Sequence, residues 1–470
     1  MKLLLTLLKV VLLACISYST LSKATERQPY ELLRFNENWQ SFDSTSETEQ
    51  APFDSIKYIP LNNSGDVWLS MGGQVRYRGE NWKNFNFNNP ADSVHDDSFS
   101  LFRGFIHTDF HFGEHLRLFI MAKSALSEGR ELSGERRSVD VDTIALQNAF
   151  VDFTHPISAE SDLTLRAGRQ QLLFGSRRLL DPPFWANVKR PLDGFSAILT
   201  TTNWTFTPFS VRPVVIHKYD RNRTDDNVHF SGLSVEGQFN SSLSDLDMYL
   251  YRFSNKNVTI NGTSGDEKRY TVGAHIKGSF PRSSLDYDIE AAYQFGGVNE
   301  HDIHAYMLAT ELGYSFKQWR TAPRIFLGLE FATGDNASGG DVETFNQLFP
   351  LGHASFGYVD MVGRQNIIDL RQGISFLPNP KLTIKIEGHY FWRESIHDAL
   401  YNPGGKVVRN GELSPDRDIG QEIDISAKYR YDRHIGMLMG YSKFFAGDFI
   451  KQSGSASSIN FAYLMLEYTF

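Results

Sequence analysis

The feature that most limits how this chain can fold is an alternation of apolar and polar residues, repeated in strand-length segments along most of the sequence. In a β-strand, successive side chains point to opposite faces, so each segment has one apolar and one polar face. In the last segment the apolar face holds Ala462, Leu464, Leu466, Tyr468 and Phe470. A soluble β-sandwich also alternates. A membrane barrel does so with one face in lipid and the other in the lumen.

The first 24 residues favour the membrane barrel, because they form a secretory signal peptide by pattern. Lys2 is followed by an apolar run from Leu3 to Ser17 and by the small residues Ser22 and Ala24. A membrane anchor would need about 20 apolar residues. A lipoprotein cleavage at Cys15, the only cysteine, would leave a short apolar stretch before it. We therefore expect export, cleavage after about Ala24, and a mature chain without cysteine.

The net charge of the chain argues against nucleic acid as a partner. The net charge is −8, and it becomes −11 once Lys2, Lys9 and Lys23 are removed with the leader. An acidic chain is not expected to bind nucleic acid. The net charge says little about a lumen, because it averages over loops and wall.

Counting the alternating segments predicts an all-β fold, an 18-stranded antiparallel transmembrane β-barrel. The predicted strands are 67–78, 99–112, 115–126, 143–154, 162–173, 192–202, 204–216, 229–240, 245–255, 268–280, 285–297, 302–315, 322–333, 366–377, 381–392, 418–432, 435–447 and 456–470. Short links alternate with links that are mostly long, among them 256–267, 334–365 and 393–417, while 298–301 is a short exception. Short periplasmic turns and long extracellular loops are typical of bacterial outer-membrane barrels.

Three regions follow from this pattern: a signal peptide at 1–24, a polar segment at 25–66 and the barrel at 67–470. The segment 25–66 has no strand pattern, and either a periplasmic tail or a plug inside the barrel fits it. An aromatic residue at position 470 resembles the signal that the barrel-assembly machinery recognises. The predicted location is the bacterial outer membrane, in contact with its lipid and lipopolysaccharide.

The polar faces carry many charges, which we place in the lumen because a charge at mid-bilayer costs about 2–4 kcal/mol. Arginine is prominent among them, interleaved with Asp and Glu. Ion pairs within the wall would explain this mixture. A selectivity lining would also explain it, because a guanidinium binds carboxylate with two parallel hydrogen bonds and keeps its charge.

Motifs for catalysis or cofactors do not stand out, so neither an enzyme nor a cofactor is predicted. The 14 histidines are scattered. The Gly-rich acidic loop 333–341 has oxygen ligands that could hold Ca²⁺, but it lacks the calcium-loop spacing and the closing Glu. We expect a plain exposed loop there and no metal site.

Several motifs resemble, in order, those of the alginate-export outer-membrane porins. They are Asp140 to Asp152, Leu165 to Gln171, Phe174 to Leu179, Asn187 to Gly194, Gly340 to His353 with Gly357 and Asp360, Asn366 to Arg371, His397 to Tyr401 and Gly420 to Asp424. The likeness extends over about residues 67–470. Each motif alone is weak, whereas their order and combination are specific.

The resemblance implies an 18-stranded barrel with an electropositive constriction that passes a polyuronate. The family's pore residues map onto Arg76, Arg103, Arg166, Arg169, Asp193, Arg364 and Arg371. Arg364 lies in a loop that approaches a strand, so its match is the least direct.

The sequence therefore predicts a passive outer-membrane channel for an anionic polysaccharide or oligosaccharide, with alginate as the leading substrate and a monomer as the expected state. The alternative within the same class is a porin that takes up small carboxylates or oligouronates. An outer-membrane hydrolase and a structural or adhesive barrel closed by 25–66 are rivals from other classes. The direction of transport is not encoded in a single sequence.

Overall fold

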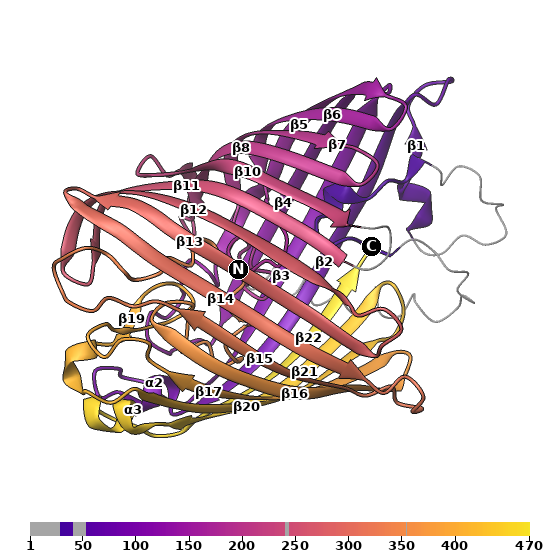
Figure 1. Ribbon diagram of the computed structural model, residues 1–470. Helices are drawn as coiled ribbons and strands as arrows, with labels where there is room; N and C mark the ends of the chain where they lie inside the picture. The colour runs from indigo at the N-terminus through magenta and orange to yellow at the C-terminus, as the bar shows by residue number, and fades with distance from the viewer. Residues whose placement is uncertain (1–28, 41–52, 240–243, 354) are drawn as a thin grey trace.

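The computed structural model describes residues 29–40, 53–239, 244–353 and 355–470. Eighteen long antiparallel strands form one closed barrel (Figure 1). They are β2 (Val67–Lys83), β3 (Asp97–Phe112), β4 (Leu116–Glu128), β5 (Asp142–Ser158), β6 (Ser161–Gln170), β7 (Leu192–Thr200), β8 (Trp204–Val215), β10 (Val228–Phe239), β11 (Ser244–Ile260), β12 (Thr263–Ser279), β13 (Leu285–Val298), β14 (His301–Ser315), β15 (Arg324–Ala332), β16 (Ile367–Asn379), β17 (Leu382–Trp392), β20 (Asp418–Arg430), β21 (Ile435–Ala446) and β22 (Ile459–Thr469).

The first and last strands close the ring. β2 pairs with β22 from Gln74 opposite Thr469 to Lys83 opposite Asn460. The predicted fold class is thus confirmed, and most predicted strand limits lie within three residues of the observed ones. β2 is an exception, because it continues five residues beyond the predicted end at 78.

Alternation along β20 shows that the wall has an apolar outer face and a polar face toward the lumen. Ile423 and Ile425 are 47% and 46% exposed on the outer face, whereas Glu422 and Asp424 are 1% and 2% exposed toward the lumen. An apolar outer band and a polar interior are what a bilayer requires of a spanning barrel. No helix in the described ranges is long and apolar enough to cross a membrane.

One predicted loop is wrong. Residues 256–267 were expected to form a long loop, but β11 and β12 extend through them to Ile260 and Thr263. Only Asn261 and Gly262 remain between the strands, both with positive φ (40° and 89°). A two-residue Asn-Gly turn suits the twist of a hairpin, and this local signal outweighs the polar composition.

Short elements lie mainly in the connections. They are β1 (Ile59–Pro60), β9 (Arg223–Thr224), β18 (Leu400–Tyr401), β19 (Val407–Arg409), α2 (Phe85–Asn88), α3 (Asp448–Ser453) and the 3₁₀ turns η1 (Arg34–Asn36), η4 (Asp54–Ile56) and η5 (Gly411–Leu413). In Figure 1, α2, α3 and β19 lie at one end of the barrel, while β1 and the C-terminus lie at the other. We take the first as the extracellular end, because the long loops emerge there.

The long loops 171–191 and 333–366 fold into the barrel and meet there. Leu180 forms a parallel β-bridge with Phe349, and the amide of Phe349 donates to the carbonyl of Leu179 at 2.9 Å. Phe349 also packs edge-on against Phe230 of β10. An apolar core therefore fills part of the lumen, built from loop and wall side chains together.

Candidate functional site in the barrel lumen

The candidate site is a group of cations on the inner wall of β2 and β3, facing the loop 171–191. Arg76 and Arg103 occupy directly paired positions on the two strands. Their side chains are 1% and 2% exposed. Both predicted pore residues therefore point into the barrel, side by side.

These two arginines bind the loop rather than an open channel. Arg76 donates to the carbonyls of Phe184 and Ala186 at 2.8 and 3.1 Å, and Arg103 donates to the same carbonyls at 3.2 and 3.0 Å. Asn187 adds a side-chain acceptor for Arg76 at 3.2 Å. Four hydrogen bonds from two guanidinium groups thus fix the backbone of the loop against the wall.

Arg78 and Lys189 complete the group. The guanidinium carbon of Arg78 lies 3.9 Å from the ring centroid of Trp185, and its Nη1 donates to the Trp185 carbonyl. The amine of Lys189 lies 4.2 Å from the ring centroid of Phe184. Burial, followed by the nearby charge of Arg103, holds the pKa of Lys189 well below its usual value.

Carboxylates balance only part of this charge. Arg78 pairs with Glu80 at 2.7 Å, and Arg103 lies 3.7 Å from Glu467. Among the residues that the structure describes, neither Arg76 nor Lys189 forms an ion pair. Backbone carbonyls and aromatic faces supply the stabilisation in place of carboxylates, and the group keeps a positive excess.

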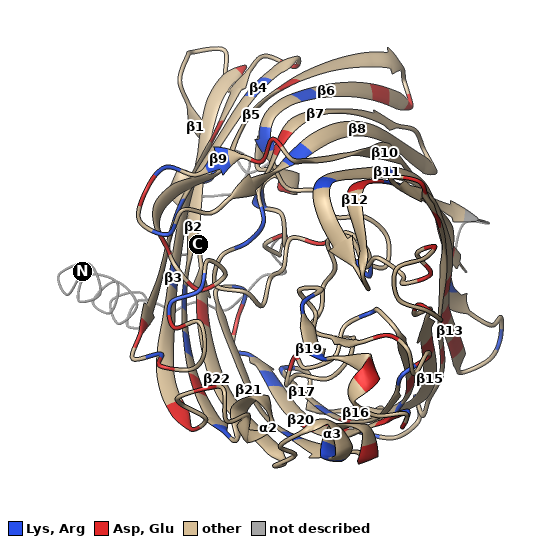
Figure 2. Ribbon diagram, turned by 90° about the vertical axis from the view of Figure 1, so that its left-hand side faces the viewer, with Lys and Arg blue, Asp and Glu red and all other residues tan. Residues whose placement is uncertain are grey.

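The other end of the loop is attached to the opposite wall. Arg178 pairs with Asp288 at 2.9 Å and Glu290 at 3.1 Å, and it lies 3.7 Å from Glu330. The loop thus crosses the lumen from β2 and β3 to β13 and β15. Figure 2, which views the barrel from its extracellular end, shows these strands on opposite sides of the ring.

The remaining predicted pore residues are held in ion pairs. Arg166 makes two parallel hydrogen bonds to Asp152, at 2.7 and 2.8 Å, and Arg169 does the same with Asp193, at 2.7 and 2.9 Å. Arg364 pairs with Glu330, and Arg371 pairs with Glu311. These pairs stabilise the wall. The register places Arg169 and Asp193 on the same face as the outward Ala167 and Phe195, so the prediction that these two residues line the pore is wrong.

The N-terminal segment 29–40 lies beneath the loop, at the periplasmic end of the lumen. Arg34 donates to the carbonyls of Gly73 and Phe470, both at 3.1 Å. Phe35 packs with Phe119 and Phe150, and the loop residue Phe184 packs on the same cluster. The loop and the segment are therefore successive obstacles along the same side of the lumen.

A hollow of about 600 Å³ opens on the far side, against β11 to β15. Its charged lining is mixed and comprises Asp245, Lys277, Asp286, Asp288, Glu311 and Arg324. Arg324 is itself paired with Asp286 and Glu311, at 2.5 and 2.7 Å. In this conformation the hollow is thus bordered by four carboxylates and two cations.

The sequence identified the wall arginines but not their partners in the loop. Arg178, Trp185 and Lys189 lie within the motifs Phe174 to Leu179 and Asn187 to Gly194, or between them, and none was singled out as a site residue. The pattern Arg177-Arg178 followed by Lys189-Arg190 in one link was the available signal. Long basic side chains in a loop rarely reveal which wall they reach.

Comparison with known proteins agrees with this architecture. The profile of the alginate export family matches residues 67–463, almost the whole barrel. The chain belongs to the alginate export family. No curated protein matches the sequence of this alginate export family member.

Solved structures with a similar fold come from Pseudomonas aeruginosa. OccD3 (OpdP) has a TM-score of 0.55 and 12% identity, covering 85% of this chain and 91% of its own. OpdO has 0.54 and 10%, covering 85% and 97%, and the outer membrane protein OpdK has 0.54 and 10%, covering 85% and 99%. These likenesses concern the fold. Together with the family, they identify a channel-forming protein of the bacterial outer membrane.

Proposed function

We propose that this alginate export family member is a passive channel for an anionic polysaccharide or oligosaccharide, with a polyuronate such as alginate as the leading candidate. The observation that carries the proposal is the group formed by Arg76, Arg78, Arg103 and Lys189, in which Arg76 and Lys189 have no carboxylate partner in the described chain. Arg76 and Arg103 are at the centre of the proposed pore lining. The ion-paired Arg166, Arg364 and Arg371 belong to the wall around it.

The physical basis is an exchange of acceptors. Arg76 donates to the two backbone carbonyls from Nη1 and Nη2, and Arg103 donates to the same carbonyls from Nη1 while its Nη2 donates to Gln74. A carboxylate offers two oxygens to the same fork and adds a charge, so its hydrogen bonds are stronger. A passing uronate can therefore replace the loop carbonyls, while Glu80 and Glu467 limit how tightly it is held. Permeation requires this balance between entry and release.

The loops 171–191 and 333–366 are the gates in this proposal. Their mutual contact at Leu180 and Phe349 holds the closed arrangement.

The segment 25–66 acts as a plug, because Arg34 and Phe35 occupy the periplasmic end of the lumen. The signal peptide predicted at 1–24 lies outside the described residues. We further propose a monomer that carries out no covalent chemistry and reaches the membrane through the barrel-assembly machinery.

Planar-bilayer recording tests the proposal. In a KCl gradient the reversal potential should show anion selectivity, and mannuronate oligomers should interrupt the current. Substituting Arg76→Gln together with Lys189→Gln should weaken both effects, whereas Arg212→Gln, which removes an exposed cation 44% accessible to solvent, should leave both unchanged. A cation-selective channel that ignores the oligomers would overturn it.

The length of the oligomer separates the two substrate classes. Block that strengthens from monomer to hexamer supports a polymer channel, because successive uronates occupy successive cations. Equal block by a monomeric carboxylate would instead favour uptake of small carboxylates.

Deleting residues 25–66 should raise the conductance, and an unchanged conductance would rule out the plug.

A further inference from the structure

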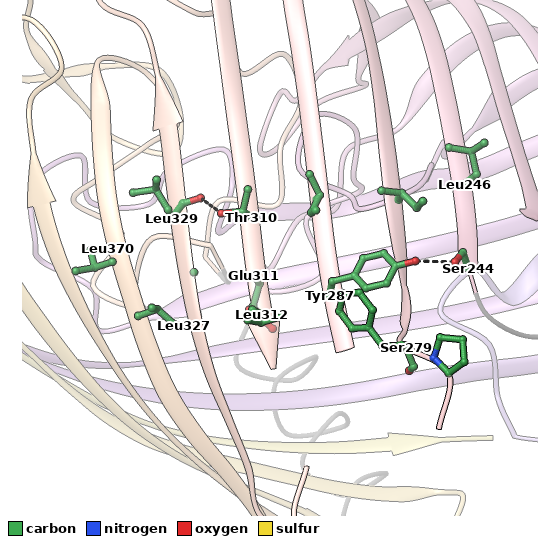
Figure 3. Close-up of a pocket in the computed structure, with 15 residues that line it drawn as sticks. Ser244, Leu246, Ser279, Tyr287, Thr310, Glu311, Leu312, Leu327, Leu329 and Leu370 are labelled. Atoms are coloured by element: carbon green, nitrogen blue, oxygen red, sulfur yellow. Dashed lines mark hydrogen bonds between the residues drawn. The ribbon is translucent and has the colours of Figure 1, made fainter. Parts of the chain in front are cut away.

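The outer face of the barrel holds a hollow that the proposed channel does not use. It has a volume of about 1120 Å³ and lies across β11 to β16. Figure 3 shows its lining, with Leu246, Tyr287, Leu312, Leu327, Leu329 and Leu370 on neighbouring strands. The hollow faces away from the lumen, because on β13 Ile289 lines it while the adjacent Asp288 and Glu290 contact Arg178 inside the barrel.

The register shows how the hollow forms. One row across the strands reads Leu246, Ile276, Ile289, Thr310, Leu329 and Leu370. The next row places Gly278 between Ser244 and Tyr287. Small residues at Gly278 and Thr310 leave space between the long side chains around them, and the hydroxyl groups of Ser244 and Tyr287 bond to each other at 2.7 Å. The lining therefore presents mostly hydrocarbon outward.

The hollow continues along the wall. A second hollow of about 640 Å³ shares Leu329 with the first and is lined by Ala291, Tyr293, Tyr306 and Phe331. Tyr287 and Tyr293 are six residues apart on one strand, or about 20 Å at 3.3 Å per residue. With a strand tilt of 35–45°, this spans about 15 Å of membrane depth, which is half of the hydrocarbon core. The groove is thus as deep as one leaflet.

The end of the groove nearest the periplasm is basic. Phe280 and Pro281, in the turn after β12, line the hollow itself, and the next residue, Arg282, is exposed. The turn after β14 carries Lys317 and Arg320, both exposed, beside Trp319, which is 62% exposed. Within the described chain, none of these three cations forms an ion pair.

The basic turns lie on one half of the ring, where the turns after β16 and β20 also carry Lys381 and Arg433. The turns between β3 and β4, between β5 and β6, and between β7 and β8 contain Glu114 and Glu160 but neither Lys nor Arg. A general attraction to the membrane surface would not require the cations and the apolar groove to coincide. An anionic headgroup attached to an acyl chain does require it, because the phosphate lies at the rim while the chain lies in the groove.

We infer that the outer groove over β11 to β16 is a phospholipid-binding site, which takes an acyl chain between its leucines and an anionic phosphate at Arg282, Lys317 and Arg320. The ligand comes from the periplasmic leaflet, since the basic turns are at that end. The site is independent of the lumenal cations. Lipid binding there does not depend on which solute the channel transports.

Native mass spectrometry of the full chain tests the site, after release from nanodiscs of phosphatidylcholine containing phosphatidylglycerol. The wild-type barrel should retain phosphatidylglycerol above its share of the bilayer. Thr310→Phe, which fills the groove, should abolish the enrichment, whereas Ala167→Phe, an outward position on β6, should not. Each of Arg282→Gln, Lys317→Gln and Arg320→Gln should lower the retention by about fivefold.

Folding of each variant is checked by its heat-modifiable mobility, which is the difference in electrophoretic migration before and after boiling. Equal enrichment in the wild type and in Thr310→Phe would overturn the site. So would enrichment of lipid A in place of phosphatidylglycerol when both are supplied. A dimer mass in the wild type that Thr310→Phe abolishes would also overturn it, because a second copy of the chain would then occupy the groove.

Discussion

Leu180 and Phe349 face each other in a parallel β-bridge inside the barrel, although they belong to different long loops. Hydrogen bonds flank the bridge on both sides, from the amide of Asp181 to the carbonyl of Phe349 and from the amide of Phe349 to the carbonyl of Leu179, each at 2.9 Å. Arg190 reinforces it by donating to the Phe349 carbonyl at 3.1 Å. The two loops therefore move together or separate at this point.

A disulfide between these positions should lock the gate. Neighbouring strands lie about 4.8 Å apart, within the Cα separation of about 4.4–6.8 Å that a disulfide accepts. The double variant Leu180→Cys and Phe349→Cys should show fewer openings after oxidation and recover with reductant in single-channel recording. The single-cysteine variants are the controls. A crosslinked channel that opens as often as the reduced one would show that the loops do not separate in gating.

Arg76 and Arg103 should show strong energetic coupling, because they donate to the same two carbonyls. Arg76→Met or Arg103→Met alone should cost about 1–3 kcal/mol of unfolding free energy, since one donor remains for each carbonyl. The double variant should cost more than the sum, because the half-buried carbonyls of Phe184 and Ala186 then lose both arginine donors. Arg212→Met, which removes an exposed ion pair, should cost less than about 1 kcal/mol. Additive losses in denaturant unfolding would contradict the shared-acceptor geometry.

Docking of the N-terminal segment should depend on pH through Lys57. Its amine donates to the Met71 carbonyl at 2.8 Å and lies 5.2 Å from the ring centroids of Tyr30 and Trp39, which belong to the segment 29–40. Burial, followed by the charge of Arg34, lowers the pKa of Lys57 from 10.5 to about 7. The undocked state thus binds the proton more tightly, so docking should strengthen as pH rises from about 7 toward 10.5 and should be weakest below 7.

Hydrogen exchange of residues 29–40 at pH 7 and pH 9, corrected for intrinsic rates, measures this effect. Protection should increase at the higher pH in the wild type. In Lys57→Met it should be nearly the same at both values. An equally steep pH dependence in that variant would assign the effect to another group.

Asp335 should make the loop 333–366 sensitive to acid, in the opposite sense. Its carboxylate accepts from the amide of Thr344 at 2.6 Å and lies near Asp398, which accepts from Asp335's own amide at 3.0 Å. Burial, followed by the charge of Asp398, raises the pKa of Asp335 from 3.8 to about 6. The folded loop binds the proton more tightly, so its stability should increase as pH falls from about 6 to 4 and then level off.

Single-channel recording at pH 5 and pH 8 checks this prediction. Openings should be rarer at pH 5 in the wild type, because the loop is then held more firmly. Asp335→Asn should remove the difference while keeping an acceptor for the loop amides, and Asp341→Asn, an exposed acid in the same loop, should keep it. More frequent openings at pH 5 would contradict the assignment.

The strands were predictable because lipid and lumen impose opposite demands on alternate residues. Ile423 and Ile425 could only face outward, and this placed Glu422 and Asp424 inside. Strand ends were less certain where turn chemistry competed with composition, as at Asn261-Gly262, which closed a hairpin within a predicted loop.

The lumenal site was predictable only in part. Arg76 and Arg103 were assigned to the inner face correctly by periodicity. Their acceptors are backbone carbonyls of Phe184 and Ala186, and a carbonyl is present in every residue, so no side-chain pattern marks it. The attachment of Arg178 to β13 and β15 depends on how the loop crosses the barrel, which is a tertiary property.

The hydrogen bonds of Arg34 have a consequence for the order of assembly. One guanidinium group contacts Gly73 of the first wall strand and Phe470 beside the last, residues that come together only when the ring has closed. The contact with Phe470 joins positions 436 residues apart, so it requires almost the whole chain to be in place. Docking of the N-terminal segment therefore reports completed closure, and an incompletely joined barrel would leave its entrance unsealed.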